Sequence, residues 1–216
     1  HAALSPAVKE IWGSFEPVNA KFRVIDVKYA KGAALAGERF VKWNSSSRVA
    51  LAPQRGNGQL EIVIDADAAT SIPNIDFASL SEKDRAGLLS QGPGLPYALR
   101  PGARTLVIGP GGGYDVARAL ASGSKDVTGV EINPIIANTI MRERFAALSG
   151  GLYLRPDVHI HVEDGRSYVR RVRERYQVIQ ATLVDTWAST AAGAFALSES
   201  TLYTTDAFRD YLDRLT

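Results

Sequence analysis

The sequence predicts an α/β fold in which a doubly wound, mostly parallel sheet follows a small β-rich N-terminal domain. Three observations support this prediction. Residues 1–75 contain short runs in which polar and apolar side chains alternate, which is typical of strands in antiparallel sheets. Residues 101–216 alternate between short apolar runs and segments with helical spacing. A glycine-rich loop, Gly109–Gly113, lies where the first of these apolar runs turns into the first helix.

The N-terminal domain, residues 1–75, contains four short strand candidates. In the first of them, Ile25, Val27 and Tyr29 share one face of the strand, and polar residues lie on the other. Turns rich in glycine, asparagine and serine separate the candidates, as expected for strands joined by loops. The predicted strands are Phe22–Tyr29, Arg39–Trp43, Arg48–Leu51 and Leu60–Ile64.

Residues 76–100 are predicted to be a connector with one short helix. Ser81 followed by Asp84 has the spacing of a capping box, which marks the start of a helix. The segment Gln91–Pro96 contains two glycines and two prolines, which predict that the helix is broken there. The α/β domain is therefore expected to begin at about residue 101.

The α/β domain, residues 101–216, repeats a strand and a helix along its length. Its first strand, Thr105–Ile108, is apolar enough to be buried on both faces of a parallel sheet. Four such units in series predict a doubly wound sheet, and sheets of this kind usually continue, so we expect a truncated C-terminal edge. The other predicted strands are Asp126–Val130, Val158–Val162 and Tyr176–Val184, and the predicted helices are Asp115–Ser122, Pro134–Leu148, Ser167–Arg175 and Thr205–Leu215.

The glycine loop is the main candidate ligand site, because bare backbone amides at the start of a helix let a ligand approach closely. A glycine loop alone also fits a tight turn, but the strand before it and the helix after it favour binding. A dinucleotide fingerprint would need glycine where Tyr114 stands. The spacing of Gly109, Gly111 and Gly113 is instead similar to the nucleoside-binding loop of S-adenosylmethionine-dependent transferases.

Acidic residues follow the three later strands, at the sheet edge where open α/β folds bind ligands. Glu131 ends the second strand and can accept hydrogen bonds from ribose hydroxyls, although it also fits a solvent-facing strand end. Asp164 with Gly165 follows the third strand, where an acid can accept from an adenine amino group or cap a helix. Asp185 follows the fourth strand, and Trp187 beside it fits either the wall of an apolar pocket or the core.

Five motifs of the α/β domain carry a resemblance to a known family: Val107–Gly113, Val130–Pro134, Glu163–Arg166, Tyr176–Ile179 and Leu202–Leu212. The domain resembles the spermidine synthases, the polyamine aminopropyltransferases. It resembles more closely the bacterial spermidine synthase-like proteins, some of which are fused to membrane segments. The resemblance implies a class I methyltransferase-like Rossmann fold with a small β-rich N-terminal domain.

The same resemblance implies an activity and a set of site residues. The activity is transfer of an aminopropyl group from decarboxylated S-adenosylmethionine to a small-molecule amine of the polyamine class, without a metal. Asp185 would orient the amine, and Trp187 and Tyr203 are further candidate substrate contacts. The implied nucleoside-binding residues are Gly109, Gly111, Gly112, Gly113, Glu131, Asp164 and Gly165.

Two positions depart from the family pattern. Thr182 stands where the family has an aspartate that helps to deprotonate the attacking amine, so Thr182 and Asp185 are the catalytic candidates. Glu199 is a second candidate carboxylate, or simply a surface acid. Gly112 stands where the family has an aspartate that holds the ammonium group of the donor, and Asp115 is a candidate substitute. We therefore expect weaker discrimination against S-adenosylmethionine that keeps its carboxylate.

Two alternative functions stay open. Gly112 and Thr182 also fit an S-adenosylmethionine-dependent methyltransferase on the same scaffold. Thr182 fits equally a non-catalytic nucleoside-sensing or interaction module that keeps the pocket. NAD-dependent oxidoreduction is less favoured than these because of Tyr114.

Composition limits the classes of partner. The chain carries 25 basic and 23 acidic residues, so its net charge of +2 gives no reason to expect nucleic acid or an anionic membrane as a partner. The absence of cysteine excludes thiolate metal sites, His159 and His161 lack a third ligand nearby, and the arginines of residues 166–175 fit a solvated helix face. We expect a cytoplasmic protein, or the soluble domain of a larger membrane-anchored protein, without membrane contact of its own. The family resemblance implies a homodimer.

Overall fold

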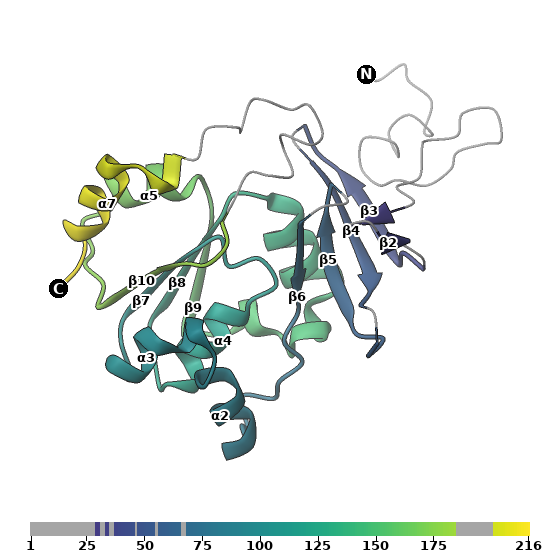
Figure 1. Cartoon of the computed structure of the whole chain (residues 1–216), viewed down its shortest axis with the longest axis horizontal. Helices are drawn as coiled ribbons and strands as arrows, with labels where there is room; N and C mark the ends of the chain where they lie inside the picture. The colour runs from purple at the N-terminus through teal and green to yellow at the C-terminus, as the bar shows by residue number, and fades with distance from the viewer. Residues whose placement is uncertain are drawn as a thin grey trace. The chain divides into compact units, whose positions relative to one another are not determined.

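The computed structural model describes residues 29–30, 33–34, 37–45, 47–54, 56–65, 68–184 and 201–216. Within these residues the chain forms two compact units that divide after Ser71, and the second unit comprises residues 72–184 and 201–216. Figure 1 labels the main strands and helices of both units. Most of the predicted strand over residues 22–29 lies outside the described residues.

The first unit contains an antiparallel sheet of four strands. They are β3 (Phe40–Trp43), β4 (Arg48–Pro53), β5 (Leu60–Ile64) and β6 (Ala68–Ser71), in that spatial order, and a short antiparallel pair, β1 (Tyr29–Ala30) and β2 (Ala33–Ala34), precedes them. The strands β3, β4 and β5 confirm the sequence prediction. The strand β6 was not predicted, because its sequence Ala-Ala-Thr-Ser has no large apolar side chain; pairing with β5 creates it.

A buried ion pair lies at the start of β4. The guanidinium of Arg48 donates two hydrogen bonds to the carboxylate of Glu38, at 2.8 and 2.7 Å, and the Arg48 side chain is 1% exposed. The backbone N–H of Arg48 donates to Asp65 Oδ1 at 2.7 Å, while burial raises the pKa of Asp65. Because a charge buried this deeply is costly without its partner, Glu38 holds Arg48 in the sheet.

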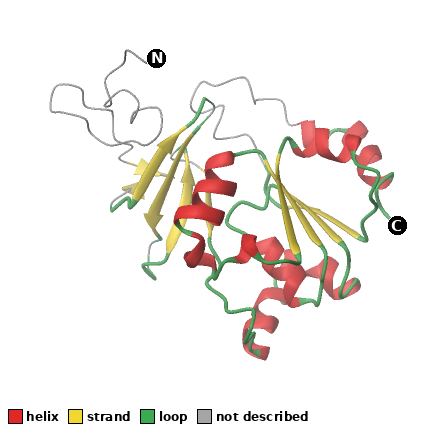
Figure 2. Cartoon of the chain, turned by 180° about the vertical axis from the view of Figure 1, so that it is seen from behind, coloured by secondary structure: helices red, strands yellow, loops and turns green. Residues whose placement is uncertain are grey.

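The second unit contains a parallel sheet of four strands. They are β7 (Thr105–Ile108), β8 (Val127–Glu131), β9 (Val158–Val162) and β10 (Val178–Ala181). Their spatial order is β10-β7-β8-β9, so the chain crosses from one edge of the sheet to the other between β9 and β10. Every residue of β7 is buried, as its apolar sequence predicted. Figure 2 shows helices on both sides of this sheet, which confirms the doubly wound arrangement.

The main helices of the second unit are α2 (Glu82–Leu89), α3 (Leu95–Leu99), α4 (Tyr114–Ala121), α5 (Gly165–Arg171) and α7 (Thr205–Leu212). The helix α2 begins as predicted, with the Asp84 N–H donating to Ser81 Oγ at 3.1 Å. The predicted break over Gln91–Pro96 is confirmed, because α2 ends at Leu89, but the connector holds more than the one short helix that was predicted. The chain does leave α2 there, but it continues as a 3-10 turn, η1 (Gly92–Gly94), and as α3, because proline fits the first turn of a helix. The helix α5 ends four residues before the predicted boundary.

The segment predicted as one α-helix over residues 134–148 takes another form. It is a π-helix, η2 (Ile135–Arg144), followed by two 3-10 turns, η3 (Ala146–Ser149) and η4 (Leu152–Leu154). The spacing of apolar residues predicts that a helix forms here. It does not distinguish an α-helix, with hydrogen bonds between residues four apart, from a π-helix, in which they are five apart. The wider turn is therefore a tertiary feature of the fold.

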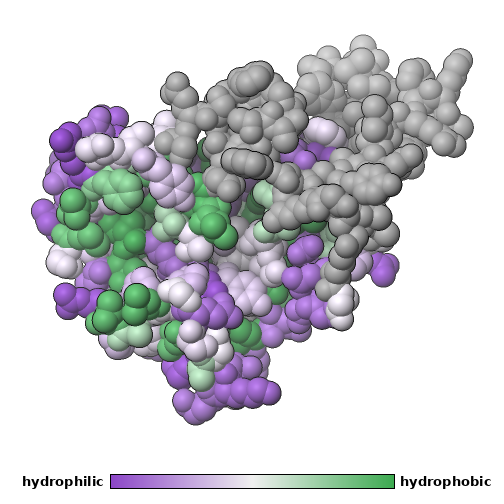
Figure 3. Space-filling model, in the orientation of Figure 1, coloured by the Kyte–Doolittle hydropathy of each residue, from purple (hydrophilic) through white to green (hydrophobic). Residues whose placement is uncertain are grey.

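A hydrophobic cluster joins the sheet to α5 and α7. Its members include Leu106, Ile108, Val130, Tyr168, Val169, Tyr176, Ala207 and Tyr211. At the amino end of β10, Leu215 forms a parallel bridge with Tyr176. Leu95 and Leu99 of α3 and Phe208 and Leu212 of α7 are exposed. Figure 3 shows green hydrophobic patches on the side of the molecule that it displays. No helix among the described residues has the length and apolar content needed to cross a membrane.

Candidate nucleoside-binding site

The parallel register brings the predicted site residues to one edge of the sheet. Ile108 at the end of β7 lies opposite Val130 on one side and Ala181 on the other. The glycine loop that follows Ile108 is therefore flanked by Glu131 and by Thr182. Asp164 follows β9, the neighbour of β8, two residues beyond Val162. The carboxyl ends of parallel strands form the ligand-binding edge of such sheets, so these residues occupy the expected place.

The three spaced glycines of the loop all have positive φ, at 64° for Gly109, 52° for Gly111 and 101° for Gly113. There is also little space for a side chain at two of these glycines. A Cβ atom on Gly113 would lie 2.6 Å from Leu152 Cδ2, and one on Gly109 would lie 2.9 Å from Val184 Cγ1. Both the backbone conformation and the packing therefore require glycine here.

Glu131 is bonded to the loop through its carboxylate. Its Oε2 accepts a hydrogen bond from the Gly111 N–H at 3.0 Å, and its Oε1 accepts from the Asn133 N–H at 2.9 Å. The residue is 5% exposed, and burial raises the pKa of its carboxyl group although backbone N–H groups oppose this shift. The backbone N–H of Ile132 also acts on this carboxylate. A carboxylate has about four acceptor sites, so capacity remains for a ribose hydroxyl.

Tyr153 is a site residue that sequence reasoning missed. Its hydroxyl donates to the carbonyl oxygen of Gly111 at 2.8 Å, across a separation of 42 residues. Burial raises the pKa of Tyr153 well above its usual value, so the phenol stays protonated and remains a donor. Glu131 and Tyr153 thus hold the N–H and the C=O of the same glycine. No local sequence signal identifies Tyr153, because only the fold brings its turn under the loop.

Asp164 and Gly165 both have structural roles at the start of α5. Asp164 Oδ1 accepts from the Ser167 N–H at 2.8 Å, so Asp164 is the N-cap of this helix. A Cβ atom on Gly165 would lie 2.5 Å from Ile108 Cγ2, so glycine lets α5 approach β7 closely. Asp164 Oδ2 has no hydrogen-bond partner among the described residues and can accept from a ligand.

The carboxylate of Asp115 is compensated within the protein. Its Oδ1 lies 2.6 Å from Arg118 Nη1, and both side chains are about nine-tenths buried. Arg118 Nη2 also donates to Gln91 Oε1 at 2.6 Å, which ties α4 to the residue preceding η1. A carboxylate in this environment offers little free charge to an ammonium group of a ligand.

The part of the candidate site predicted to contact the amine substrate is described up to residue 184. Thr182 Oγ1 accepts from Gln180 Nε2 at 2.9 Å, and the Val184 N–H donates to the Tyr203 hydroxyl at 3.2 Å. Leu183 between them has a positive φ of 51°, a conformation that apolar residues rarely adopt. Asp185, Trp187 and Glu199, the other predicted residues of this side, lie outside the described residues.

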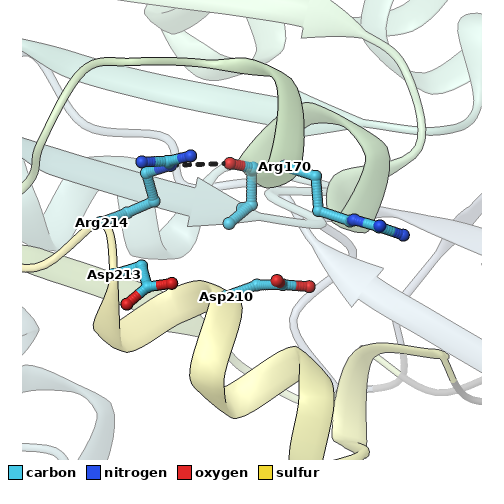
Figure 4. A pocket seen from close by; sticks show the side chains of 5 residues that line it. Arg170, Asp210, Asp213 and Arg214 are labelled. Atoms are coloured by element: carbon cyan, nitrogen blue, oxygen red, sulfur yellow. Dashed lines mark hydrogen bonds between the residues drawn. The ribbon is translucent and has the colours of Figure 1, made fainter.

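Other charged residues of the second unit make none of the contacts described above. His159 and His161 are exposed, and the described residues contain no group of His, Cys, Asp and Glu able to hold a metal ion. The prediction that Arg166 belongs to a solvated face is wrong: Arg166 Nε donates to Asp210 at 2.7 Å and its side chain is 17% exposed. Figure 4 shows side chains that line a pocket between α5 and α7, formed by Val169, Arg170, Asp210, Asp213 and Arg214. In it, Arg214 Nε donates to the Val169 carbonyl oxygen.

No protein-family model and no curated protein matches the sequence. Among solved structures, the chain is similar to a spermidine synthase in complex with the transition state analogue AdoDATO. The TM-score is 0.56 at 17% identity, over 85% of this chain and 54% of that one. It is also similar to the spermidine synthase from Thermotoga maritima, with a TM-score of 0.59 at 18% identity, over 88% of this chain and 59% of that one. The chain therefore spans less than two thirds of the length of either structure, and over that span it has a spermidine synthase-like fold.

Proposed function

We propose that this chain is a transferase that binds the nucleoside of an S-adenosylmethionine-type donor over the glycine loop. The observation that carries the proposal is the hydrogen bond between Glu131 and Gly111, which joins the acid at the end of β8 to the middle of the loop. The structural neighbour that holds AdoDATO supports a ligand of this class. Binding at the carboxyl edge of the sheet is also the general rule for open α/β folds.

Different described residues would contact the ribose and the adenine of the nucleoside. The free lone pairs of Glu131 accept from the ribose hydroxyls, and Asp164 Oδ2 accepts from the adenine amino group. The loop glycines give the sugar close access to the backbone. Glu131 and Tyr153 hold the two peptide groups on either side of the Gly111 Cα, so little loop ordering is needed when the nucleoside binds.

Aminopropyl transfer to an amine of the polyamine class is the reaction that the fold favours. The amine nitrogen attacks the carbon beside the sulfonium, the new C–N bond forms as the C–S bond breaks, and the thioether nucleoside leaves. The amine proton must pass to a base, because a protonated amine has no lone pair with which to attack. A threonine hydroxyl is a poor base at neutral pH, so we assign this step to Asp185 and not to Thr182.

Methyl transfer from S-adenosylmethionine is the second candidate. Gly112 has no side chain, and the charge of the nearby Asp115 is compensated by Arg118. Neither residue supplies the free carboxylate that would select an ammonium tail over a carboxylated one. This observation favours a donor that keeps its carboxylate.

Titration calorimetry with 5′-methylthioadenosine, S-adenosylmethionine and decarboxylated S-adenosylmethionine tests the proposal. We expect the nucleoside to bind, and Glu131→Ala to weaken binding by about 10- to 100-fold, since a hydrogen bond to a charged group is worth about 1.5–3 kcal/mol. Glu143→Ala, which removes an exposed acid of η2, serves as the control. Failure of all three compounds to bind would refute the proposal.

Product analysis separates the two reactions. Release of 5′-methylthioadenosine from the decarboxylated donor in the presence of 1,4-diaminobutane indicates aminopropyl transfer. Release of S-adenosylhomocysteine from S-adenosylmethionine indicates methyl transfer. Binding without either product identifies a nucleoside-sensing module and refutes the transferase assignment.

A further inference from the structure

Arg166, near the start of α5, binds three acceptors that lie far away in the sequence. Its Nε donates to Asp210 Oδ2 at 2.7 Å. Its Nη1 donates to the carbonyl oxygen of Thr201 at 2.9 Å and to Thr204 Oγ1 at 3.1 Å. One guanidinium group can serve all three acceptors because its N–H donors form a rigid planar fork. Arg166 therefore joins α5 to α7, which lies beside it in Figure 1, and to the turn before α7.

Two of these acceptors determine where that turn lies. It is a 3-10 turn, η6 (Thr201–Tyr203), and α7 follows it directly. Thr204 Oγ1 also accepts from the Ala207 N–H at 3.1 Å, so Thr204 is the N-cap of α7. Arg166 thus holds the first residue of η6 and the residue that follows its last one, which fixes the whole turn against α5.

The last residue of η6, Tyr203, reaches the end of β10. Its hydroxyl accepts a hydrogen bond from the Val184 N–H at 3.2 Å. The side chain of Val184 lies against the glycine loop, because a Cβ atom on Gly109 would be 2.9 Å from Val184 Cγ1. A continuous series of contacts therefore runs from Arg166 through η6 to the glycine loop.

The backbone at the end of β10 depends on such contacts. Leu183, which precedes Val184, is exposed and has a φ of 51°. An apolar residue rarely adopts this left-handed conformation, which persists only where the surrounding structure enforces it. The hydrogen bond from Val184 to Tyr203 and the packing of Val184 on Gly109 are contacts of this kind.

The position of α7 does not depend on Arg166 alone. Ala207 and Tyr211 of α7 belong to the hydrophobic cluster that joins this helix to the sheet and to α5. Beyond the end of α7, Arg214 Nε donates to the Val169 carbonyl oxygen at 3.0 Å. Replacing Arg166 should therefore leave the second unit folded and loosen mainly η6 and the first turn of α7.

We propose that Arg166 is a positioning residue: it holds η6, and through Tyr203 it keeps the end of β10 against the glycine loop. The inference rests on the proposed function, in which Asp185 receives the amine proton. Asp185 directly follows Val184, so a shift of Val184 moves the start of the segment that carries this base. Arg166 also lies two residues after Asp164, the candidate adenine contact. The start of α5 thus serves both the nucleoside and the amine parts of the site.

Hydrogen exchange of the Val184 amide, followed by NMR on the full chain, tests this positioning without a ligand. Arg166→Met keeps a long side chain but has no donor. We expect it to speed the exchange by about 2- to 10-fold, the effect of losing one hydrogen bond. Tyr203→Phe should have the same effect, because it removes the acceptor. The double variant should exchange no faster than Tyr203→Phe, since both changes break one series of contacts.

Arg170→Met is the matched control for the exchange measurement. Arg170 lies in the same helix as Arg166, is exposed, and makes no hydrogen bond to η6 or α7 among the described residues. The Val184 amide of this variant should exchange as in wild type.

Steady-state kinetics tests the consequence for transfer, with whichever donor compound gives a product. We expect Arg166→Met and Tyr203→Phe to lower kcat by about 10- to 100-fold, because misplacing a catalytic group by about 1 Å can cost that much. The Kd of 5′-methylthioadenosine should stay unchanged, because Glu131 and Tyr153 hold the glycine loop independently. A purely structural role for Arg166 would instead weaken binding and turnover together.

An unchanged Val184 exchange rate in Arg166→Met would overturn the inference, and so would effects of Arg166→Met and Tyr203→Phe that add in the double variant. If Arg166→Met does not fold, Arg166→Lys replaces it, because lysine keeps the charge beside Asp210 but lacks the fork. If wild type binds 5′-methylthioadenosine and forms product, but Arg166→Met has the same kcat, only this inference fails. If wild type does neither, the proposed function fails, and the exchange rate still decides whether Arg166 holds Val184.

Discussion

The Oε2 atom of Glu131 lies 3.0 Å from the amide nitrogen of Gly111, so the acid that ends β8 and the middle glycine of the loop form one hydrogen-bonded unit. The two residues are 20 positions apart in the chain and meet because β7 and β8 are parallel neighbours. The bond means that any change at Glu131 also changes the loop. It also couples nucleoside binding to the protonation state of a buried carboxyl group.

Nucleoside affinity should therefore depend on pH. Burial raises the pKa of Glu131 above its usual 4.5, and the protonated carboxyl group is a weaker acceptor for ribose hydroxyls. Affinity should rise as the pH is raised from 4.5 through the pKa of Glu131 in the folded protein. Calorimetry of 5′-methylthioadenosine binding across this range measures the effect. Glu131→Gln should flatten the profile, and an unchanged profile in that variant would contradict the assignment.

The stability contribution of Glu131 in the unliganded protein has the opposite sign. A carboxyl group whose pKa is higher in the folded than in the unfolded state binds protons preferentially in the folded state. Its contribution to the free energy of unfolding therefore falls as the pH rises from about 4.5 through its folded pKa. Urea denaturation at several pH values should show a shallower fall in Glu131→Gln than in wild type.

Tyr153→Phe should loosen the glycine loop. The substitution removes the donor that lies 2.8 Å from the Gly111 carbonyl oxygen. We expect a loss of about 0.5–1.5 kcal/mol in the free energy of unfolding, and nucleoside binding that is weaker by a few-fold. Tyr114→Phe is a suitable control, since the Tyr114 hydroxyl makes no hydrogen bond among the described residues. Equal effects of the two substitutions would argue against a specific role for Tyr153.

Gly165→Ala should destabilise the second unit. The new Cβ atom would lie 2.5 Å from Ile108 Cγ2, and this β-branched side chain is buried in the core, where another χ1 rotamer would clash with its neighbours. We expect a cost of about 1–3 kcal/mol in urea denaturation, typical of overpacking in a core. Gly87→Ala in α2 should instead stabilise, by up to about 1 kcal/mol, because nothing lies within 4 Å of its added Cβ atom. A tolerated Gly165→Ala would show that α5 can shift away from β7.

Arg48→Met should strongly destabilise the first unit. It leaves the carboxylate of Glu38, 18% exposed, without its partner. Breaking a buried pair in this way costs about 3–5 kcal/mol. The double variant Arg48→Met/Glu38→Leu should recover most of the loss, because no buried charge remains. If the double variant is as unstable as the single one, packing and not charge is the reason that Arg48 is needed.

Much of the fold could be predicted from local patterns. The apolar run of β7 and the short apolar segments of β4 and β5 locate strands, because burial in a sheet demands those side chains. The same reasoning failed where strand pairing or tertiary packing determines the local structure. The strand β6 has no apolar pattern of its own, and the π-helical form of η2 is invisible to spacing. The helical turns after Gln91 were missed because proline and glycine also occur in helix starts.

The candidate site likewise contains residues that the sequence could identify and residues that it could not. Gly109–Gly113, Glu131 and Asp164 could be identified by sequence because each follows a predicted strand, and the carboxyl ends of parallel strands share one edge. Tyr153 and Gln180 could not, since their hydrogen bonds depend on contacts across 42 and 87 residues. Nor could the sequence show that Arg118 forms an ion pair with the carboxylate of Asp115.

The sequence by itself determined the order of strands and helices and the position of the glycine loop, because these depend on hydrophobic periodicity and on the conformational freedom of glycine. Only the tertiary structure decided which polar groups are already bonded to one another and which remain available to a ligand. Hydrogen bonds between distant residues, such as Tyr153 with Gly111 and Gln180 with Pro93, form only when the chain is packed. Their donor and acceptor directions then determine the chemistry that the site can recognise.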